Sequence, residues 1–395
     1  MANMIAPIMS ERRISIIGAM LIAVGPVSMY LYLPAVSEIA QSFGATAAEV
    51  KFTVSIYFAG FACSQLVVGP LSDAIGRRPA LYCFIGCFCA ASVAAYFADT
   101  IGLLIAARFV QGIGAAAGMS ISRALVRDVF TGDRSARVIN FIGLILAIAP
   151  AISPIIGGAM ITYLGWRSVF LFMAGFGFAI VLVTLLQLRE TVTADWSRLN
   201  FAASVRSYRE ILQDRQYLAA TVALAALIGA VYANNIFLPF ILIEVIGLSP
   251  VEFGVCSLVH PAGFFLGSLA VRPLIVRVAP DRLAGAGYVM IAIACLGMAA
   301  LVIHAPTLWL VLWPVAAFSF GIAFVMPAMT AAALDPFPRS AGAAASMMGF
   351  LQMSFGLVCG SAGALLPNPV LAFSTIIPAM GATAFLGFVA YRRRS

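Results

Sequence analysis

Long apolar runs separated by short polar segments make up most of the sequence. Twelve such runs are each about 20 residues long, the length that an α-helix needs to cross the hydrocarbon core of a bilayer. They cover residues 14–33, 50–69, 80–97, 101–121, 138–164, 169–188, 218–243, 251–271, 283–303, 308–331, 343–366 and 370–391. Backbone polar groups in lipid must be bonded within their own segment, so the pattern predicts an all-α membrane protein with twelve transmembrane helices.

The composition argues against a water-soluble protein. Of the 395 residues, 63% are hydrophobic and 10% are charged, whereas a soluble domain has about 25% charged residues. Too few polar side chains are present to cover a surface in water. The net charge of +8 could indicate nucleic-acid binding. The basic residues form short clusters between apolar runs, however, so we expect the lipid bilayer and no nucleic acid as a partner.

The distribution of lysine and arginine predicts the orientation. With the N-terminus in the cytoplasm, all but three of the 23 basic residues fall on the cytoplasmic side. Lys51 and Arg167 fall on the opposite side, and Arg108 lies inside an apolar run. Because short cytoplasmic loops of membrane proteins are enriched in Lys and Arg, this split predicts two cytoplasmic termini and an even number of helices.

The longest polar stretch divides the chain in two. It predicts two six-helix bundles, residues 1–190 and 217–395, joined by a cytoplasmic linker of residues 191–216. Within and just beyond this linker, residues 205–217 place charged side chains on one side and apolar ones on the other. This pattern is typical of an amphipathic helix on a membrane surface, and a plain solvated linker is the alternative.

A cluster of small and charged residues follows the second predicted helix. The segment from Gly69 to Arg78 reads GPLSDAIGRR. Gly76 permits a tight turn, and Arg77 and Arg78 can pair with Asp73 and with nearby helix ends. We expect this cluster to hold the two bundles together on the cytoplasmic side. The segment resembles the G-x-L-S/A-D-x-x-G-R-R signature of the major facilitator superfamily.

The fourth predicted helix carries a charge within an apolar run. Residues 108–116 read RFVQGIGAA, which resembles the R-x-x-Q-G-x-G-A-A motif of the same superfamily. A buried arginine in a membrane is costly and indicates a functional site. The resemblance implies that Arg108, with Gln111, takes part in a proton relay. The alternative is a structural arginine bonded to backbone carbonyls and to Gln111.

The fifth predicted helix contains two prolines and two adjacent glycines. Pro150 and Pro154 kink a helix and free its carbonyl groups. Together with Gly157 and Gly158 they resemble the G-P-x-x-G-G antiporter motif, with alanine and serine in place of two of its glycines. That resemblance implies export rather than uptake.

Three further stretches narrow the resemblance. Residues 32–35, 243–254 and 337–346 are similar to the Bcr/CflA group of bacterial multidrug efflux proteins, and the motifs occur in the same order over nearly the whole chain. This resemblance implies the major facilitator fold, with two six-helix bundles related by a pseudo-two-fold axis. It also implies a monomer in the bacterial inner membrane that exports amphipathic, drug-like molecules in exchange for protons.

The sequence departs from that group at the end of the first helix. Many members have an aspartate where this chain has Tyr30, and no carboxylate lies deep in any predicted span. His260 is the alternative proton carrier because it falls near the middle of the eighth span and its reference pKa of about 6.5 suits proton exchange. A neutral histidine satisfied by a neighbour is the competing interpretation.

Polar and aromatic residues at mid-depth are candidates for lining a substrate cavity. Two adjacent asparagines, Asn234 and Asn235, cannot both face lipid at low cost. Helix packing is the alternative role for each candidate. The candidates are Tyr30, Tyr57, Gln65, Asn140, Tyr232, Asn234, Asn235, Phe318 and Gln352.

Other functions fit the sequence less well. An exporter or importer of one metabolite, such as a sugar, a nucleoside or an amino-acid derivative, would favour a cavity with more charged groups. An intramembrane enzyme or a receptor is disfavoured because the only histidines, His260 and His304, have no matched nucleophile. No G-x-x-x-x-G-K-S/T loop is present, and the clustered cysteines Cys83, Cys87 and Cys89 lie in an apolar run without a nearby histidine or carboxylate. We therefore expect no nucleotide, cofactor or metal.

Overall fold

The chain folds almost entirely into α-helices in a computed structural model that describes residues 9–196, 201–338, 340–366 and 368–393. Within this part, twelve helices are long and apolar enough to cross a membrane. The predicted all-α fold with twelve spans is therefore confirmed. Residues 197–200 of the predicted linker and residue 339 of the third family stretch lie outside the described part.

The first six spans form the N-terminal half of the molecule. Its elements are α1 (Glu11–Tyr30), the 3-10 turn η1 (Leu33–Ala35), α2 (Val36–Phe43), α3 (Ala47–Ile75), α4 (Arg77–Tyr96), α5 (Ile101–Val129), α6 (Gly132–Leu164) and α7 (Arg167–Gln187). Helix α5 packs against α1, α3 and α4, and α7 packs against α4.

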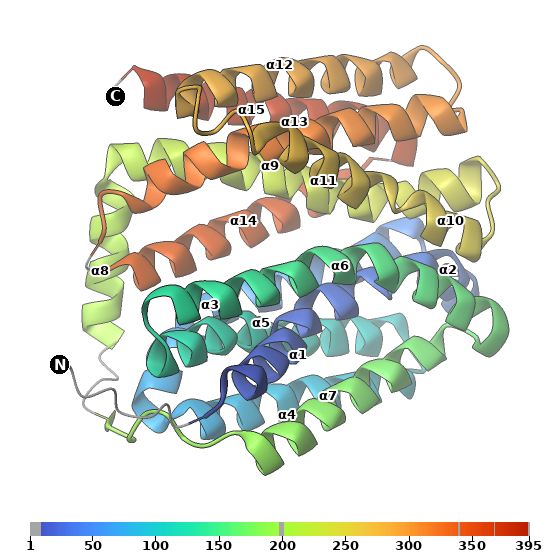
Figure 1. The fold of residues 1–395 in the computed structure, drawn as a ribbon. Helices are drawn as coiled ribbons and strands as arrows, with labels where there is room; N and C mark the ends of the chain where they lie inside the picture. Colours follow the sequence, from blue (N-terminus) through green and yellow to red (C-terminus); the bar gives the residue numbers. More distant parts are fainter. Residues whose placement is uncertain (1–8, 197–200, 339, 367, 394–395) are drawn as a thin grey trace.

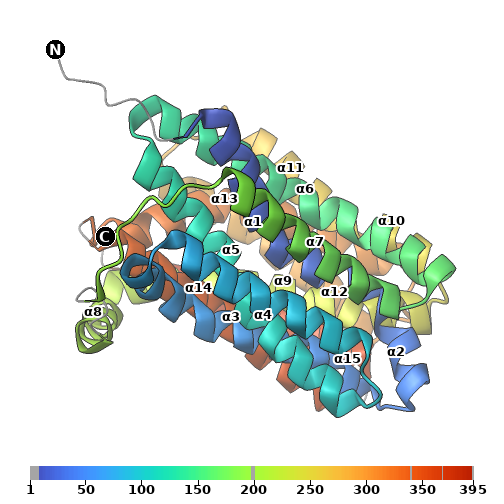
Figure 2. The same ribbon diagram turned by 90° about the horizontal axis from the view of Figure 1, so that it is seen from below.

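The last six spans form the C-terminal half. Its elements are α9 (Arg215–Pro239), the π-helical turn η3 (Phe240–Val245), α10 (Pro250–Cys256), α11 (Val259–Val271), α12 (Pro280–Ala299), the 3-10 turn η4 (Ala300–Val302), α13 (Leu308–Leu334), α14 (Ala341–Ala364) and α15 (Pro369–Arg392). Helix α13 packs against α11 and α12, and α15 packs against α9. Figures 1 and 2 show that the spans of both halves share a common long axis.

Helix α8 (Phe201–Gln213) connects the halves at one end of the molecule, which we call the arginine-rich end, where α1 begins and α15 ends. The hydroxyl of Tyr208 on α8 donates to the Leu66 carbonyl of α3 at 3.0 Å. The predicted helix of residues 205–217 has the wrong extent. Helix α8 ends at Gln213 because the next residue, Asp214, caps the start of α9. The Asp214 carboxylate accepts a hydrogen bond from the Tyr217 amide at 2.7 Å.

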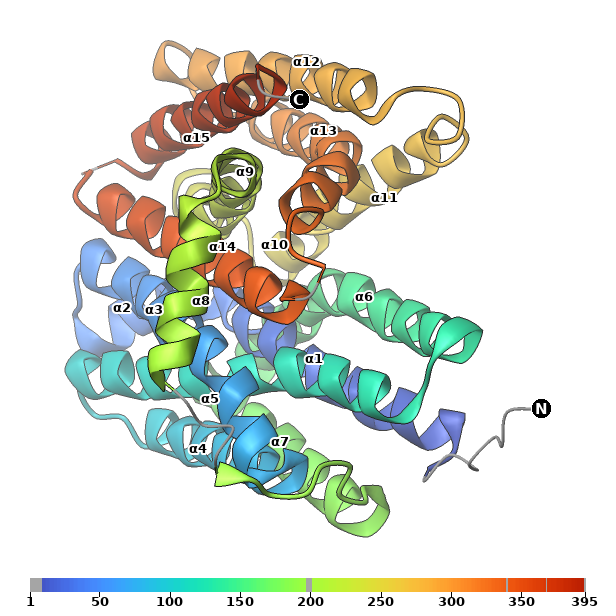
Figure 3. The ribbon, with the colours of Figure 1, turned by 90° about the vertical axis from the view of Figure 1, so that its left-hand side faces the viewer.

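The two halves meet unevenly. Helices α3 and α14 pack against each other between the halves, and α6 packs closely against α10 but only marginally against α11. Toward the arginine-rich end, α6 and α11 therefore diverge, as Figure 3 shows. Both helices expose large apolar side chains there, including Phe141, Leu144, Phe265 and Leu269.

Several helix ends differ from the hydropathy pattern. Helix α5 continues to Val129, so Arg123 and Arg127 are helical rather than in a loop. Lys51, expected on the outer side, is 1% exposed within α3, with its ammonium 5.3 Å from the centre of the Phe240 ring. Hydropathy marks only the apolar middle of a helix, so polar residues that prolong it go unseen.

Candidate functional site

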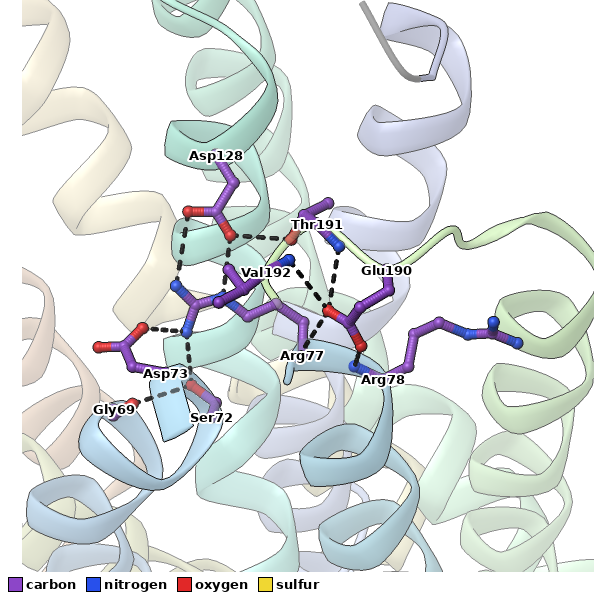
Figure 4. A network of polar contacts seen from close by, with 9 residues as sticks. All are labelled: Gly69, Ser72, Asp73, Arg77, Arg78, Asp128, Glu190, Thr191 and Val192. Carbon is purple, nitrogen blue, oxygen red and sulfur yellow. Dashed lines mark hydrogen bonds and ion pairs between the residues drawn. The ribbon is translucent and has the colours of Figure 1, made fainter. Parts of the chain in front are cut away.

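The Gly69–Arg78 segment forms a network of polar contacts around one buried arginine (Figure 4). Arg77 is 5% exposed and follows directly after the α3–α4 turn. Its guanidinium lies 2.5 Å from Asp73 and 2.9 Å from Asp128 at the end of α5. It also donates to the Ser72 hydroxyl at 2.7 Å, and that hydroxyl donates to the Gly69 carbonyl at 3.0 Å. Arg77 is thus fully compensated by opposite charge.

Glu190, just beyond α7, caps the start of α4 (Figure 4). Its two carboxylate oxygens accept from the backbone amides of Arg77 and Arg78 at 2.9 and 3.0 Å. This places a negative charge at the positive end of the α4 dipole. Gly76 has a φ of +99° and leaves the room that the carboxylate needs, since a β-carbon there would lie 2.8 Å from Glu190.

We predicted that this cluster holds the two halves together, but in this conformation its contacts lie within one half. Every described hydrogen bond and ion pair of Asp73, Arg77 and Arg78 stays inside the N-terminal half. The network joins α3, α4, α5 and the segment after α7, and does not bridge the two halves in this conformation. Asp128 and Glu190, which complete it, have no obvious signal in the sequence because both resemble ordinary polar helix ends.

Arg108 is buried in a different way. It is 0% exposed, and its guanidinium lies 4.4 Å from the ring centres of both Tyr32 and Tyr57. One nitrogen, Nη1, donates to Gln111 Oε1 at 2.6 Å and to the Ser28 carbonyl at 3.3 Å. Nε and Nη2 have no hydrogen-bond partner, and no described carboxylate forms an ion pair with this arginine. Two aromatic faces supply its main electrostatic compensation.

Gln111 carries the Arg108 network further. Its Nε2 donates to the Ser92 hydroxyl at 2.7 Å. The structure thus brings together the predicted pair Arg108 and Gln111, but both lie inside the N-terminal half, whereas His260 contacts α13 in the C-terminal half. The three proton-relay candidates therefore occupy two separate places.

The glycines of the antiporter-like motif close the end opposite the arginine-rich end. A β-carbon at Gly157 would collide with the Leu31 carbonyl at the end of α1. One at Gly158 would collide with the Pro250 carbonyl of α10, in the other half. From the other side of the same contact, a β-carbon at Gly254 of α10 would lie 2.7 Å from the Pro154 carbonyl of α6. Glycine is needed here because two helix backbones touch across the halves.

Pro150 and Pro154 lie within α6 without ending it. Pro154 is buried and faces α10 through its carbonyl, whereas Pro150 is half-buried. The motif therefore brings Pro154, Gly157 and Gly158 into the contact between halves and leaves Pro150 a full turn away.

His260 lies at a break in the eighth span. Helix α10 ends at Cys256 and α11 begins at Val259, because Pro261 has no amide hydrogen to bond the carbonyl one turn earlier. The Ser319 hydroxyl donates to the Val315 carbonyl at 2.8 Å. It therefore accepts from His260 Nδ1, 2.5 Å away. This contact places the proton of the neutral ring on Nδ1 and leaves Nε2 as an acceptor.

Four of the predicted residues line one cavity between the halves, which we call the apex cavity. Its polar lining is Tyr30, Asn234, Asn235, Ser257 and His260. Asn235 Nδ2 donates to the Tyr30 hydroxyl at 3.2 Å across the two halves. Its apolar lining comprises Leu33, Leu238, Phe253, Cys256, Pro261 and Val315. No aspartate, glutamate, lysine or arginine is among these residues.

The other predicted cavity residues take different places. Tyr57 is 1% exposed and bonds the Ser28 hydroxyl at 2.6 Å. Tyr232 packs on Phe58 across the halves at 4.6 Å between ring centres. The remaining candidates do not line the apex cavity. Gln65 packs against Gly349 of α14, Phe318 is buried beside Gly381, Gln352 is half-buried, and Asn140 is exposed on α6.

Comparisons with known sequences agree with this architecture. The sequence profile of the Major Facilitator Superfamily matches residues 18–364. The chain is 30% identical over 390 residues, 94% of each chain, to the uncharacterized MFS-type transporter YdgK of Bacillus subtilis (strain 168). It is 27% identical to multidrug resistance protein D of Escherichia coli (strain K12), over 88% of each chain. It is also 28% identical to multidrug resistance protein MdtL of Escherichia fergusonii, over 86% of this chain and 84% of that one.

Solved structures share the fold at low sequence identity. A bacterial homolog of the human lysosomal transporter Spinster, in an inward-facing and unoccupied conformation, matches with a TM-score of 0.74 over 97% of both chains and 16% identity. A D-xylose–proton symporter matches with a TM-score of 0.72 over 95% of this chain and 97% of that one, at 13% identity. With a profile match over most of its length, the chain belongs to the Major Facilitator Superfamily.

Proposed function

We propose that the protein exports amphipathic, drug-like molecules across the bacterial inner membrane in exchange for protons, acting as a monomer by alternating access. Relatives at 27% and 28% identity over most of the chain carry the name multidrug resistance protein. The antiporter-like motif on α6 also favours export. In this fold two halves rock about a central site, so that it opens to one side of the membrane at a time.

The observation that carries the proposal is the uneven contact between the halves. Gly158 and Gly254 bring α6 and α10 into backbone contact at one end, while α6 and α11 diverge toward the arginine-rich end. If the arginine-rich end lies in the cytoplasm, as the positive-inside rule implies, this conformation loads substrate from the cytosol. Release outside then requires the two glycine contacts to separate.

Proton exchange needs a titratable group within reach of the cavity. Tyr30 stands where many members of the Bcr/CflA group have an aspartate, and the imidazole that lines the apex cavity is that of His260. Its Nδ1 is tied to Ser319, so Nε2 is the atom free to take up a proton from the cavity. Separation of the halves would change the solvent that reaches this atom, which is the condition for coupling proton binding to substrate release.

The test is export by purified protein in proteoliposomes under an imposed pH gradient, with a panel of antibiotics and fluorescent dyes. The proposal predicts gradient-driven transport of several amphipathic compounds. His260→Ala should abolish the pH-driven component while substrate still binds, because Nε2 is lost. His304→Ala is the matched control, since His304 is exposed in the loop before α13. Undiminished pH-driven transport by His260→Ala would rule out His260, and transport of one metabolite alone would rule out multidrug export.

A further inference from the structure

The side chain of Asn234 is an unpaired polar group in the apex cavity. It is 5% exposed, and neither Oδ1 nor Nδ2 has a hydrogen-bond partner. Because both atoms are unpaired, this holds for either orientation of the amide. Buried polar groups are nearly always hydrogen-bonded, so an amide left with a free donor and a free acceptor requires an explanation.

The neighbours of Asn234 add further unused hydrogen-bonding groups. His260 Nε2 is an acceptor, because Nδ1 already donates to Ser319. The Tyr30 hydroxyl accepts from Asn235, and among the described contacts its own hydrogen is not used. The cavity thus offers both donors and acceptors from four side chains on α1, α9 and α11.

The charges around the cavity restrict what can bind there. No charged side chain lines it, so an ammonium or carboxylate group would be desolvated without a counter-ion, which is strongly unfavourable. Arg108 does not supply one, because it is 0% exposed and its two faces are covered by Tyr32 and Tyr57. The free space in this conformation holds about one water molecule, so a head group larger than that enters the cavity only when the two halves move apart.

We propose that the apex cavity binds the uncharged head group of an amphipathic substrate, and that this head group both donates and accepts hydrogen bonds, as a carboxamide does. The proposal rests on the proposed export function and specifies its substrate class. Asn234 would pair with the head group through its amide, and His260 Nε2 would accept a second hydrogen bond. The apolar body of the substrate would extend along the apolar lining.

The test is equilibrium binding to the full-length protein in lipid nanodiscs, with empty nanodiscs subtracted. Three probes share one ten-carbon chain and differ in the head group: decanamide, decyltrimethylammonium and decanoate. Decanamide should bind about tenfold more tightly than either charged probe, which corresponds to one well-placed pair of hydrogen bonds. N,N-dimethyldecanamide, which lacks the donor, should lose most of this advantage.

Two variants locate the effect. Asn234→Leu should weaken decanamide binding by about tenfold and leave the two charged probes unchanged. Thr221→Val is the matched control, a buried polar side chain on the same helix that does not line the cavity. Monodisperse elution of each variant in detergent shows that it is folded.

Three results would overturn the inference. The first is binding of decyltrimethylammonium or decanoate as tight as that of decanamide. The second is an equal loss of affinity for all three probes in Asn234→Leu. The third is an unchanged affinity for every probe in Asn234→Leu, which would mean that Asn234 binds only a water molecule. In each case, pH-driven export by the wild type in proteoliposomes would still support the proposed function. Absence of export with the expected head-group preference intact would instead refute export and leave this binding site.

Discussion

Two arginines are buried in the described part of the N-terminal half, and they are compensated in opposite ways. Arg77, at the arginine-rich end, lies within ion-pair distance of Asp73 and Asp128. Arg108, about two turns into α5, lies between two tyrosine rings and leaves two nitrogens unbonded. The exposure of the two residues is nearly equal, at 5% and 0%, so burial alone does not separate their roles.

The difference shows which arginine stabilises the fold. Removing a buried arginine that has carboxylate partners is costly, because the carboxylates are left without their counter-charge. Removing a buried arginine that has none leaves no uncompensated charge behind. Arg77 should therefore contribute to stability, and Arg108 should be retained for transport in spite of its cost. Four substitutions test this contrast.

Arg77→Met should have the largest effect on stability. It leaves Asp128 and Asp73 without their partner, and we expect the free energy of unfolding to fall by about 3 kcal/mol. Arg78→Met is the control, because the described side-chain contacts of Arg78 are with Tyr82 alone, and it should cost less than about 1 kcal/mol. Thermal unfolding in detergent measures both, and equal losses would refute the role assigned to Arg77.

Arg108→Met should affect transport instead. The free energy of unfolding should stay within about 1 kcal/mol of the wild type or rise, since an incompletely bonded charge is removed. Transport should fall roughly a hundredfold, as when one pre-organised charged donor is lost from a site of low dielectric. The pair of measurements is thermal unfolding and uptake into proteoliposomes. A variant that unfolds readily but transports normally would reverse our assignment.

Gly76→Ala tests the turn that positions Arg77. Gly76 has φ +99° and ψ 156°, a backbone region essentially restricted to glycine, and a β-carbon there would press on the Glu190 carboxylate, so we expect a loss of about 1–3 kcal/mol. Gly69→Ala is the control in the same segment. Gly69 is helical and has nothing within 4 Å of a β-carbon, so this change should be neutral or stabilise by up to about 1 kcal/mol. Equal thermal shifts for the two variants would show that the turn does not matter.

Gln111→Glu would make Arg108 resemble Arg77. Gln111 Oε1 already accepts from Arg108 at 2.6 Å, so the near-isosteric carboxylate gives that charge a partner. We expect a gain of about 1 kcal/mol in the free energy of unfolding together with slower transport. Gln111→Met, which removes the acceptor, should lose a similar amount of stability. If both variants shift thermal unfolding in the same direction, the charge on Arg108 is not what limits stability.

Much of the fold could be predicted because the bilayer imposes it. A run of about 20 apolar residues has few structures open to it in lipid, so twelve spans follow from the sequence. The ends of the helices are harder to predict, because polar residues prolong helices beyond the apolar core. Arg127 and Lys51 both lie within helices but were expected outside the membrane on either side. Helix α2 is also absent from the prediction, although two sequence signals mark its end. Gly44 is the glycine that ends it, and Thr46 and Glu49 form the capping pair that starts α3.

The candidate site could be predicted only in part. Asn234, Asn235 and His260 stand out as polar residues in apolar runs, but their partners depend on the tertiary structure. Tyr30 is 205 positions from Asn235, and Glu190 is 113 positions from Arg77. A single sequence carries no signal for such pairs, since hydropathy describes each helix alone and not the face that it turns to its neighbours.

The most direct test of the account as a whole is substrate-driven proton movement. Purified protein is reconstituted in vesicles that contain a pH-sensitive dye, and a transported compound is added on one side with no initial pH difference. Proton antiport through His260 predicts that protons move in the direction opposite to the substrate in the wild type and in His304→Ala, and that no proton flux occurs in His260→Ala. Substrate movement without proton flux in the wild type, or unchanged flux in His260→Ala, would contradict it.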